Sequence, residues 1–433
     1  MNFKAKNFDV FLRYVRFMAL VFIVCGALFL ALWISPFDKP DENLHFYKAF
    51  AVSQGHFICP VENGHVVNPI PSSVHDFVEA PNKVPETKSV LTPTINEQNS
   101  CVLPFIYYLL PGLTIFVLWS MHVPITIIFF AGRLTNVCFA LLILFISLKR
   151  LPIKLQLPSF FIYTLPMTLF QISSYSKDVY HIALGIFLLN KLFLFLSEKK
   201  LSDWDIGSFI FALILFILTR PQYGWFVLLL FLLPLTKSKK HHLYLMLLSF
   251  SVVVGVLLFL IHHDVYLSPF NENQSLVFHA LINPQKQLLF IAKNPLSFLL
   301  TIFHSLTGFA LFYVKSAIGI FGSLNEPLPN FVYAIYIFFG IVVSGILGFS
   351  KEISVFTRAC GMFFLITVLS MLTLFLAMYL YGSPVGSDVV YALQGRYFIL
   401  LIPLVMILVA SGIAKFSQLL LLPHFRKRSI QRK

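Results

Sequence analysis

The sequence has few charged residues for its length. Asp, Glu, Lys and Arg make up 12% of 433 residues, and only 18 are acidic. Hydrophobic residues make up 58%, and the mean hydropathy is +0.83. This composition excludes an ordinary soluble globular protein and indicates a polytopic membrane protein. A glycine-rich loop followed by lysine, a nucleotide-binding pattern and a soluble catalytic region are also absent, which argues against a nucleotide-activated substrate in the cytoplasm.

Cysteine is scarce as well, with five residues in the chain. Cys25, Cys138 and Cys360 lie within apolar stretches, where cysteine behaves as a small core residue. Cys59 and Cys101 flank a long polar loop, and a disulfide between them would close this loop if it faces an oxidising compartment.

The net charge of +14 comes from 32 basic against 18 acidic side chains. The basic residues lie mainly in short loops between apolar stretches, where they set orientation rather than bind nucleic acid. Four of them, from Lys4 to Arg16, precede the first apolar stretch and place the N-terminus in the cytoplasm. The polar loop from Pro36 to Cys101 is then outside, and the basic C-terminal tail is inside.

About ten apolar stretches are predicted to cross the membrane as helices, so the expected fold class is an all-α polytopic membrane protein. They are Phe17–Ile34, Ile125–Leu148, Leu157–Ser173, Val179–Leu196, Ile206–Leu218, Gln222–Leu235, Leu243–Ile261, Phe331–Phe349, Arg358–Tyr381 and Tyr397–Ile413.

Two other apolar stretches are predicted to remain at the outer surface as juxtamembrane or re-entrant segments. If Val102–Trp119 crossed, the eight basic residues of the loops at 149–154, 199–200 and 237–240 would lie outside, against the positive-inside rule. The same rule, applied to the basic residues that follow, predicts that Pro295–Phe321 is not a single crossing. The expected organisation is one integral membrane domain, 1–433, with outer loops at 36–124 and 262–328.

The most informative motif, Pro40-Asp41-Glu42 followed by His45, comes where the chain leaves the first span. Two carboxylates and a histidine are costly to desolvate at a membrane boundary. Asp41 and His45 are four residues apart and share a helix face, with Glu42 beside them. That arrangement suits a general base or part of a metal site. The alternative is a solvated helix start, with the two carboxylates complementing the helix dipole.

A set of polar residues lies on the same outer side, where the charge rule disfavours cations. Guanidinium groups suit phosphate oxygens, so the set indicates a site for an anionic ligand. The alternative is internal pairing, for example of Lys177 with Asp178, or contact with lipid headgroups. The predicted binding residues are Arg133, Lys177, Arg220, Lys315, Gln394, Arg396 and Tyr397.

These motifs resemble a bacterial family of predicted membrane proteins, domain of unknown function 2142. The resemblance covers most of the chain, and its first and last motifs are the most specific. It is carried by Pro40-Asp41-Glu42-Asn43-Leu44-His45, Gly55, Pro104-Phe105-Ile106-Tyr107-Tyr108, Gly132-Arg133-Leu134, Ser174-Tyr175-Ser176-Lys177-Asp178, Ile320-Phe321-Gly322 and Gln394-Gly395-Arg396-Tyr397.

The family looks like a relative of the GT-C glycosyltransferases, which take a sugar from a polyprenyl-phosphate carrier on the outer membrane face. The resemblance implies that Asp41, or else Glu42, is the catalytic base. Asp178 would match a second outer acidic position, so Asp41, Glu42, His45 and Asp178 are the expected catalytic residues. Lys48 stands where we expect an arginine in the family.

The expected function is therefore a GT-C-like glycosyltransferase in a bacterial cytoplasmic membrane. Its partners would be the bilayer, a polyprenyl-phosphate sugar donor and a glycan or protein acceptor, without nucleic acid. A divalent metal ion is a candidate cofactor, although the four acidic and histidine residues do not form a recognisable metal motif. Two rivals remain: a transporter or flippase for lipid-linked sugars, and a non-catalytic subunit of a polysaccharide assembly system.

Overall fold

Helices form most of the chain that the computed structural model describes, namely residues 2–58, 61–62, 65–66, 68–81, 94–97, 103–197, 202–232, 281–322, 324–350 and 353–430. The α-helices are α1 (Asn2–Trp33), α2 (Glu42–Ser53), α3 (Ser72–Glu79), α4 (Leu109–Ser120), α5 (Ile125–Leu148), α6 (Ile153–Thr164), α7 (Pro166–Ile172), α8 (Asp178–Ser197), α9 (Asp203–Thr219), α12 (Pro284–Lys293), α13 (Pro295–Ile318), α14 (Asn330–Gly348), α15 (Ile353–Phe356), α16 (Cys360–Gly382) and α17 (Ile402–Ile430).

Three 3₁₀-helices and three small antiparallel sheets complete the described elements. The 3₁₀-helices are η2 (Phe105–Tyr108), η3 (Pro221–Leu232) and η5 (Gly395–Leu401). The sheets pair β1 (Val61–Glu62) with β2 (His65–Val66), β3 (Asn68–Pro71) with β4 (Thr94–Glu97), and β5 (Ile320–Phe321) with β6 (Glu326–Pro327).

Seven helices among the described residues are long and apolar enough to cross a membrane. They are the apolar part of α1, then α5, α8, α13, α14, α16 and the continuous run of η5 and α17. The prediction of a multi-pass helical membrane protein is therefore confirmed. The number of ten crossings stays a prediction.

Several predicted spans have a different local structure. Leu157–Ser173 is divided between α6 and α7, because Pro166 begins a new helix and disfavours helical geometry at Leu165. Gln222–Leu235 is represented by the 3₁₀-helix η3 rather than an α-helix. The predicted span Leu243–Ile261, together with Cys59 and Cys101, lies outside the described residues.

The two predicted surface segments differ from each other. Helix α4 has 12 residues, too few to cross, and it folds back along α5, where the hydroxyls of Thr114 and Thr135 lie 2.8 Å apart. In contrast, α13 is one continuous helix of 24 residues, long enough for a crossing, and the outer placement of Pro295–Phe321 stays a prediction. Pro295 lies in its first turn and Lys315 in its last, where proline and a cation are both tolerated.

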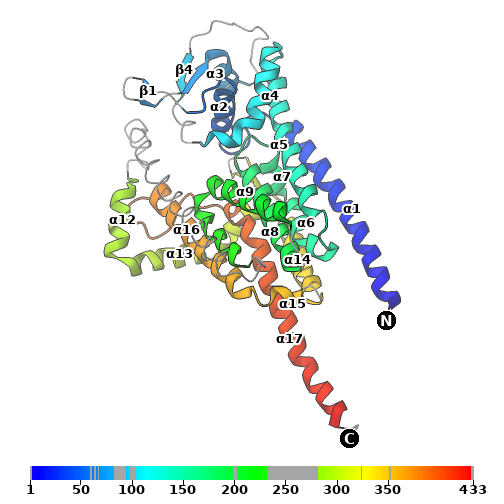
Figure 1. The fold of residues 1–433 in the computed structure, drawn as a ribbon. Coiled ribbons are helices and arrows are strands. Elements are labelled where there is room, and N and C mark those ends of the chain that lie inside the picture. Colours follow the sequence, from blue (N-terminus) through cyan, green and yellow to red (C-terminus); the bar gives the residue numbers. More distant parts are fainter. Residues whose placement is uncertain are drawn as a thin grey trace.

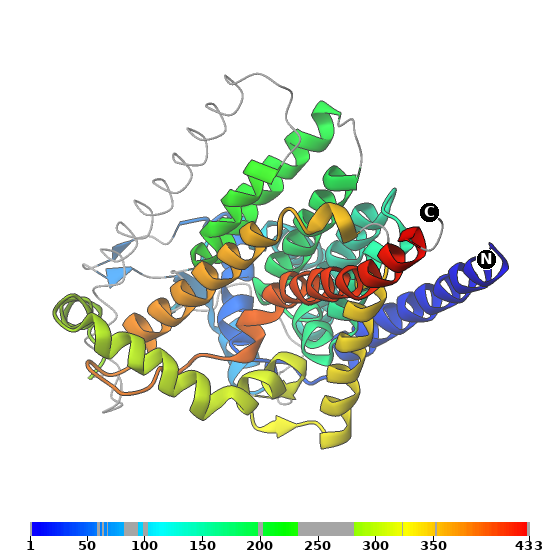
Figure 2. The same ribbon diagram turned by 90° about the horizontal axis from the view of Figure 1, so that it is seen from below.

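Burial shows which helices form the core. In α8, 89% of the apolar window is buried, whereas in α1 the share is 17%. Helix α8 is therefore the centre of the bundle, and α1 presents most of its apolar side chains outward. Both termini lie at one end of the molecule, and α2, α3 and the first strands gather at the other (Figure 1). Seen from below, α12 and α13 lie on the side away from the N-terminal half of α1 (Figure 2).

Candidate functional site

A cavity of about 370 Å³ lies where α2, α8, α9, η3, α16 and η5 meet. Seven of the residues predicted from the sequence line it: Asp41, His45, Lys177, Asp178, Arg220, Arg396 and Tyr397. The other lining residues are Leu44, Leu103, Pro104, Ser176, Leu218, Thr219, Pro221, Gln222 and Met378. Glu42, Arg133, Lys315 and Gln394 are not among the lining residues.

Asp41 presents an open carboxylate to this cavity. Its side chain is 62% exposed, and its backbone has φ of 58° in the left-handed region. Aspartate tolerates this conformation better than most residues, because its short polar side chain is compatible with it. The position immediately precedes α2, so His45 follows one helical turn later and its backbone N–H donates to the Asp41 carbonyl at 3.2 Å.

Arg396 supplies the cation nearest to Asp41. Its Nη2 donates to Asp41 Oδ2 at 3.4 Å, a long contact, and its side chain is 5% exposed. Among the described residues its buried Nε has no hydrogen-bond partner. A buried guanidinium with an unused donor is suited to an anionic oxygen. Gly395 permits this position, because a Cβ there would overlap the Tyr313 carbonyl of α13.

A second ion pair, between Arg220 and Asp178, also lines the cavity. Arg220 Nη2 and Nε donate to Asp178 Oδ1 at 2.5 and 3.1 Å. The guanidinium carbon also lies 4.3 Å from the centre of the Tyr397 ring. The Asp178 side chain is only 8% exposed. These contacts make Asp178 a partner for Arg220 and leave Asp41 as the more accessible carboxylate.

Two further titratable groups differ in charge at neutral pH. Burial, and next the charge of Arg220, lowers the pKa of Lys177 to about 8, so Lys177 is mostly protonated at pH 7. Burial, and next the charge of Lys177, lowers the pKa of His45 to about 3. His45 is therefore neutral across the physiological range and is a weak proton acceptor.

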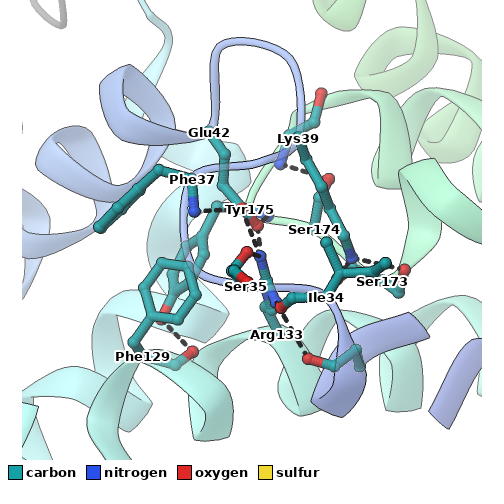
Figure 3. Close-up of polar contacts among 12 residues, drawn as sticks. Ile34, Ser35, Phe37, Lys39, Glu42, Phe129, Arg133, Ser173, Ser174 and Tyr175 are labelled. Atoms are coloured by element: carbon teal, nitrogen blue, oxygen red, sulfur yellow. Dashed lines mark hydrogen bonds and ion pairs between the residues drawn. The ribbon is translucent and has the colours of Figure 1, made fainter. Parts of the chain in front are cut away.

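Glu42 and Arg133 form a separate buried clamp rather than part of the cavity wall (Figure 3). Both side chains are 0% exposed, and Arg133 Nε and Nη2 donate to the two Glu42 oxygens at 2.9 and 2.6 Å. The remaining Arg133 donors contact the carbonyls of Ala31, Ile34 and Ser35. The clamp satisfies carbonyl groups at the end of α1 and neutralises a charge that would be costly in a membrane.

Two other predicted binding residues also lie apart from the cavity. Lys315 Nζ donates to Asn330 Oδ1 at 3.0 Å and lies 5.2 Å from the centre of the Tyr333 ring. Gln394 precedes η5, and its buried Oε1 has no hydrogen-bond partner among the described residues. The lysine at position 48 is 1% exposed and donates to the Phe57 carbonyl at 3.2 Å.

The structure adds residues that the sequence did not single out as part of the site. The Tyr108 hydroxyl lies 2.6 Å from His45 Nδ1, and His181 Nδ1 lies 2.7 Å from the Thr219 hydroxyl. Tyr108 stands in the Pro104–Tyr108 motif, so its position was visible in the sequence. Its pairing with His45, 63 residues away, was not.

Gly132, next to Arg133 in the chain, is required because the Tyr175 side chain lies too close to its backbone for any side chain at this position. A Cβ at this position would overlap the hydroxyl of Tyr175, which donates to the Phe129 carbonyl at 3.0 Å. We expect Gly132→Ala to destabilise the protein by about 1–3 kcal/mol, because it overpacks a buried contact. Gly345→Ala is the control, since its Cβ meets no atom within 4 Å, and it should be neutral or stabilising by up to ~1 kcal/mol. Thermal unfolding in detergent would measure both, and equal melting temperatures would contradict the argument.

Within the described part of the chain, no group of three or more His, Cys, Asp or Glu side chains is placed to hold a metal ion. The cavity's carboxylates, Asp41 and Asp178, contact Arg396 and Arg220 respectively. Each carboxylate of the cavity therefore lies next to an arginine.

The fold and the cavity define a multi-pass helical membrane protein with a cationic pocket between its helices. The chain belongs to the family described as predicted membrane protein, domain of unknown function 2142, whose model matches residues 23–407. No curated protein and no solved structure matches the chain.

Proposed function

We propose that this protein is a GT-C-like integral membrane glycosyltransferase of the bacterial cytoplasmic membrane. It transfers a sugar from a polyprenyl-phosphate donor, on the outer face, to an envelope glycan, a lipid-linked glycan or a protein. The observation that carries the proposal is the exposed carboxylate of Asp41 beside Arg396, whose Nε is without a partner in the described structure.

The charges of the cavity favour a phosphodiester. Lys177, Arg220 and Arg396 give three positive charges, and Asp41 and Asp178 give two negative charges, which leaves one positive charge in excess. A sugar joined to a lipid through one phosphate carries one negative charge. Binding it would balance the cavity, and Arg396 and Lys177 are the cations that the Asp178–Arg220 pair leaves available for it.

In the proposed reaction, the bond between the sugar's anomeric carbon and the phosphate oxygen breaks, and the lipid phosphate leaves with the electron pair. A bond forms between the anomeric carbon and the acceptor oxygen, whose proton passes to Asp41. Arg396 and Lys177 stabilise the charge that develops on the departing phosphate. Asp41 rather than His45 takes this role because the Asp41 side chain is 62% exposed to the cavity, whereas His45 is buried.

A second cavity supports a lipid-borne donor. It has a volume of about 340 Å³, and its lining is mainly apolar side chains of α14, α16, η5 and α17. Phe398 lines it, directly after Tyr397 in the polar cavity. On α16, Met371 lines the apolar cavity and Met378 the polar one. A lipid with its phosphate in the polar cavity would have an apolar surface for its chain close by.

The test of the proposal is a transfer assay with purified protein in lipid nanodiscs, using polyprenyl-phosphate sugars as donors. Mass spectrometry of envelope glycans from a deletion strain would identify the missing sugar and so select the donor. Incorporation of that sugar by the purified protein is the expected result. Movement of the lipid-linked sugar across the bilayer without cleavage would instead establish the transporter.

Arg396 and Lys315 provide a matched pair of variants. Arg396→Ala should weaken donor binding about 10- to 100-fold, because a charge-assisted contact with phosphate is lost, and Arg396→Lys should be impaired less. Lys315→Ala should bind the donor as the wild type does, since Lys315 lies outside the cavity. Equal affinity in all four proteins would show that Arg396 does not bind the donor.

A further inference from the structure

His45 lines the cavity and pairs with the buried Tyr108, and the transfer reaction above does not use this pair. His45 Nδ1 and the Tyr108 hydroxyl are 2.6 Å apart, and the two rings stack with centroids separated by 5.9 Å. His45 is 6% exposed and Tyr108 is 0% exposed. His45 lines the polar cavity one turn after Asp41, and within the described part of the chain its side chain bonds through Nδ1, which leaves Nε2 for a ligand.

The hydrogen bond fixes which nitrogen carries the proton. Among the described residues, the Tyr108 hydroxyl has His45 Nδ1 as its one hydrogen-bond partner. A buried hydroxyl that fails to donate loses free energy, so Tyr108 donates its proton and Nδ1 accepts it. A neutral imidazole with an accepting Nδ1 carries its hydrogen on Nε2.

The surroundings keep the imidazole uncharged. Lys177, Arg396 and Arg220 all act on His45 as like charges, and Asp178 is the carboxylate that opposes them. Burial is the largest cause of the shift, the three cations add to it, and the pKa of His45 falls to about 3. Tyr108 remains protonated as well, because burial raises the pKa of its hydroxyl well above the usual value. Both partners therefore keep their hydrogens throughout the physiological range.

We propose that Tyr108 holds His45 as a fixed, uncharged Nε2–H donor that positions an oxygen of the sugar in the cavity. The inference rests on the proposed function and names the part of the donor that His45 binds. Cations bind phosphate strongly, whereas an uncharged donor is matched to the hydroxyl and ring oxygens of a sugar. Placed one turn from Asp41, such a donor would orient the sugar relative to the group that takes the acceptor proton.

The tautomer can be measured without any transfer activity. In full-length protein labelled with ¹⁵N-histidine, the His45 signals are assigned by their loss in His45→Gln. We expect Nδ1 to resonate as an unprotonated nitrogen and Nε2 as a protonated one, without change between about pH 5 and pH 8. Tyr108→Phe should release the preference and populate the other tautomer. A protonated Nδ1 in the wild type, or titration of the ring within this range, would overturn the inference.

Ligand binding tests the second half of the inference. A short-chain polyprenyl-phosphate sugar should shift the Nε2 signal, whereas the same lipid phosphate without the sugar should not. His45→Asn should raise the KM for the donor about tenfold with a smaller change in kcat, and His45→Gln should restore most of the loss, because its amide reaches the place of Nε2. Equal shifts of the Nε2 signal with both lipids would overturn the role of His45 in sugar binding. Equal KM values for His45→Asn and His45→Gln would do the same.

The two proposals fail in different ways. One outcome is that no sugar is transferred, but the Nε2 signal shifts with the sugar-bearing lipid and not with the sugar-free lipid. The glycosyltransferase proposal then fails, and the role of His45 as a sugar ligand holds. If transfer occurs without a response at Nε2, the inference about His45 fails and the glycosyltransferase proposal is unaffected.

Discussion

Asp41→Asn should reduce sugar transfer by about 10²- to 10⁴-fold while the protein keeps its fold and its affinity for the donor. The substitution removes the proton acceptor and nearly preserves the volume of the side chain. Asparagine also tolerates the left-handed backbone at this position, where φ is 58°. Because the lost interaction belongs to the transition state, kcat should fall much more than KM rises.

The side chain of Asp41 is 62% exposed and, within the described ranges, makes one long contact, to Arg396, so its replacement should hardly change stability. Asp38→Asn is the control, since Asp38 is an exposed neighbour that does not line the cavity. Transfer by the folded Asp41→Asn protein at close to the wild-type rate would rule out the role as base. Failure of that variant to fold would instead favour the interpretation of Asp41 as a helix-start residue.

Arg133→Ala should have the largest effect on stability, a loss of about 3–5 kcal/mol in the free energy of unfolding. Removing Arg133 leaves the carboxylate of Glu42 buried at 0% exposure without its cation. It also removes the donors that bind the Ala31 and Ile34 carbonyls at the end of α1. The expected measurement is a sharp fall in the melting temperature in detergent and in the amount of folded protein in the membrane.

An arginine whose carboxylate partner has a second cation supplies the control. Arg150 Nη1 lies 3.1 Å from Asp205 Oδ2, and the Arg150 side chain is 48% exposed. Arg150→Ala should change stability by no more than ~1 kcal/mol, because Arg150 is half-exposed and Lys191 still pairs with Asp205 at 2.5 Å. Similar losses in Arg133→Ala and Arg150→Ala would contradict the role of burial. A folded Arg133→Ala protein with wild-type stability but no donor binding would instead show that Arg133 binds the donor.

Much of the site could be predicted from the sequence because a membrane makes unpaired charge conspicuous. The predicted topology puts Arg220, Arg396 and Lys177 on the side where the charge rule disfavours cations, and all three line the cavity. The same rule also selected Arg133 and Lys315, which lie elsewhere. The charge rule identifies a charge that must be neutralised, but it does not show whether a ligand or the protein itself neutralises that charge.

The apolar runs in the sequence determined the class of protein, since a helix must satisfy its own backbone groups in lipid. The sequence also determined the small set of polar residues from which a site could be built. Only the tertiary structure decided the roles of the adjacent carboxylates Asp41 and Glu42. The left-handed backbone at Asp41 sends its side chain to Arg396, 355 residues away, while Glu42 turns inward to Arg133, 91 residues away. Helix packing brings together such partners, which are far apart in the sequence, and no local sequence pattern indicates the pairing.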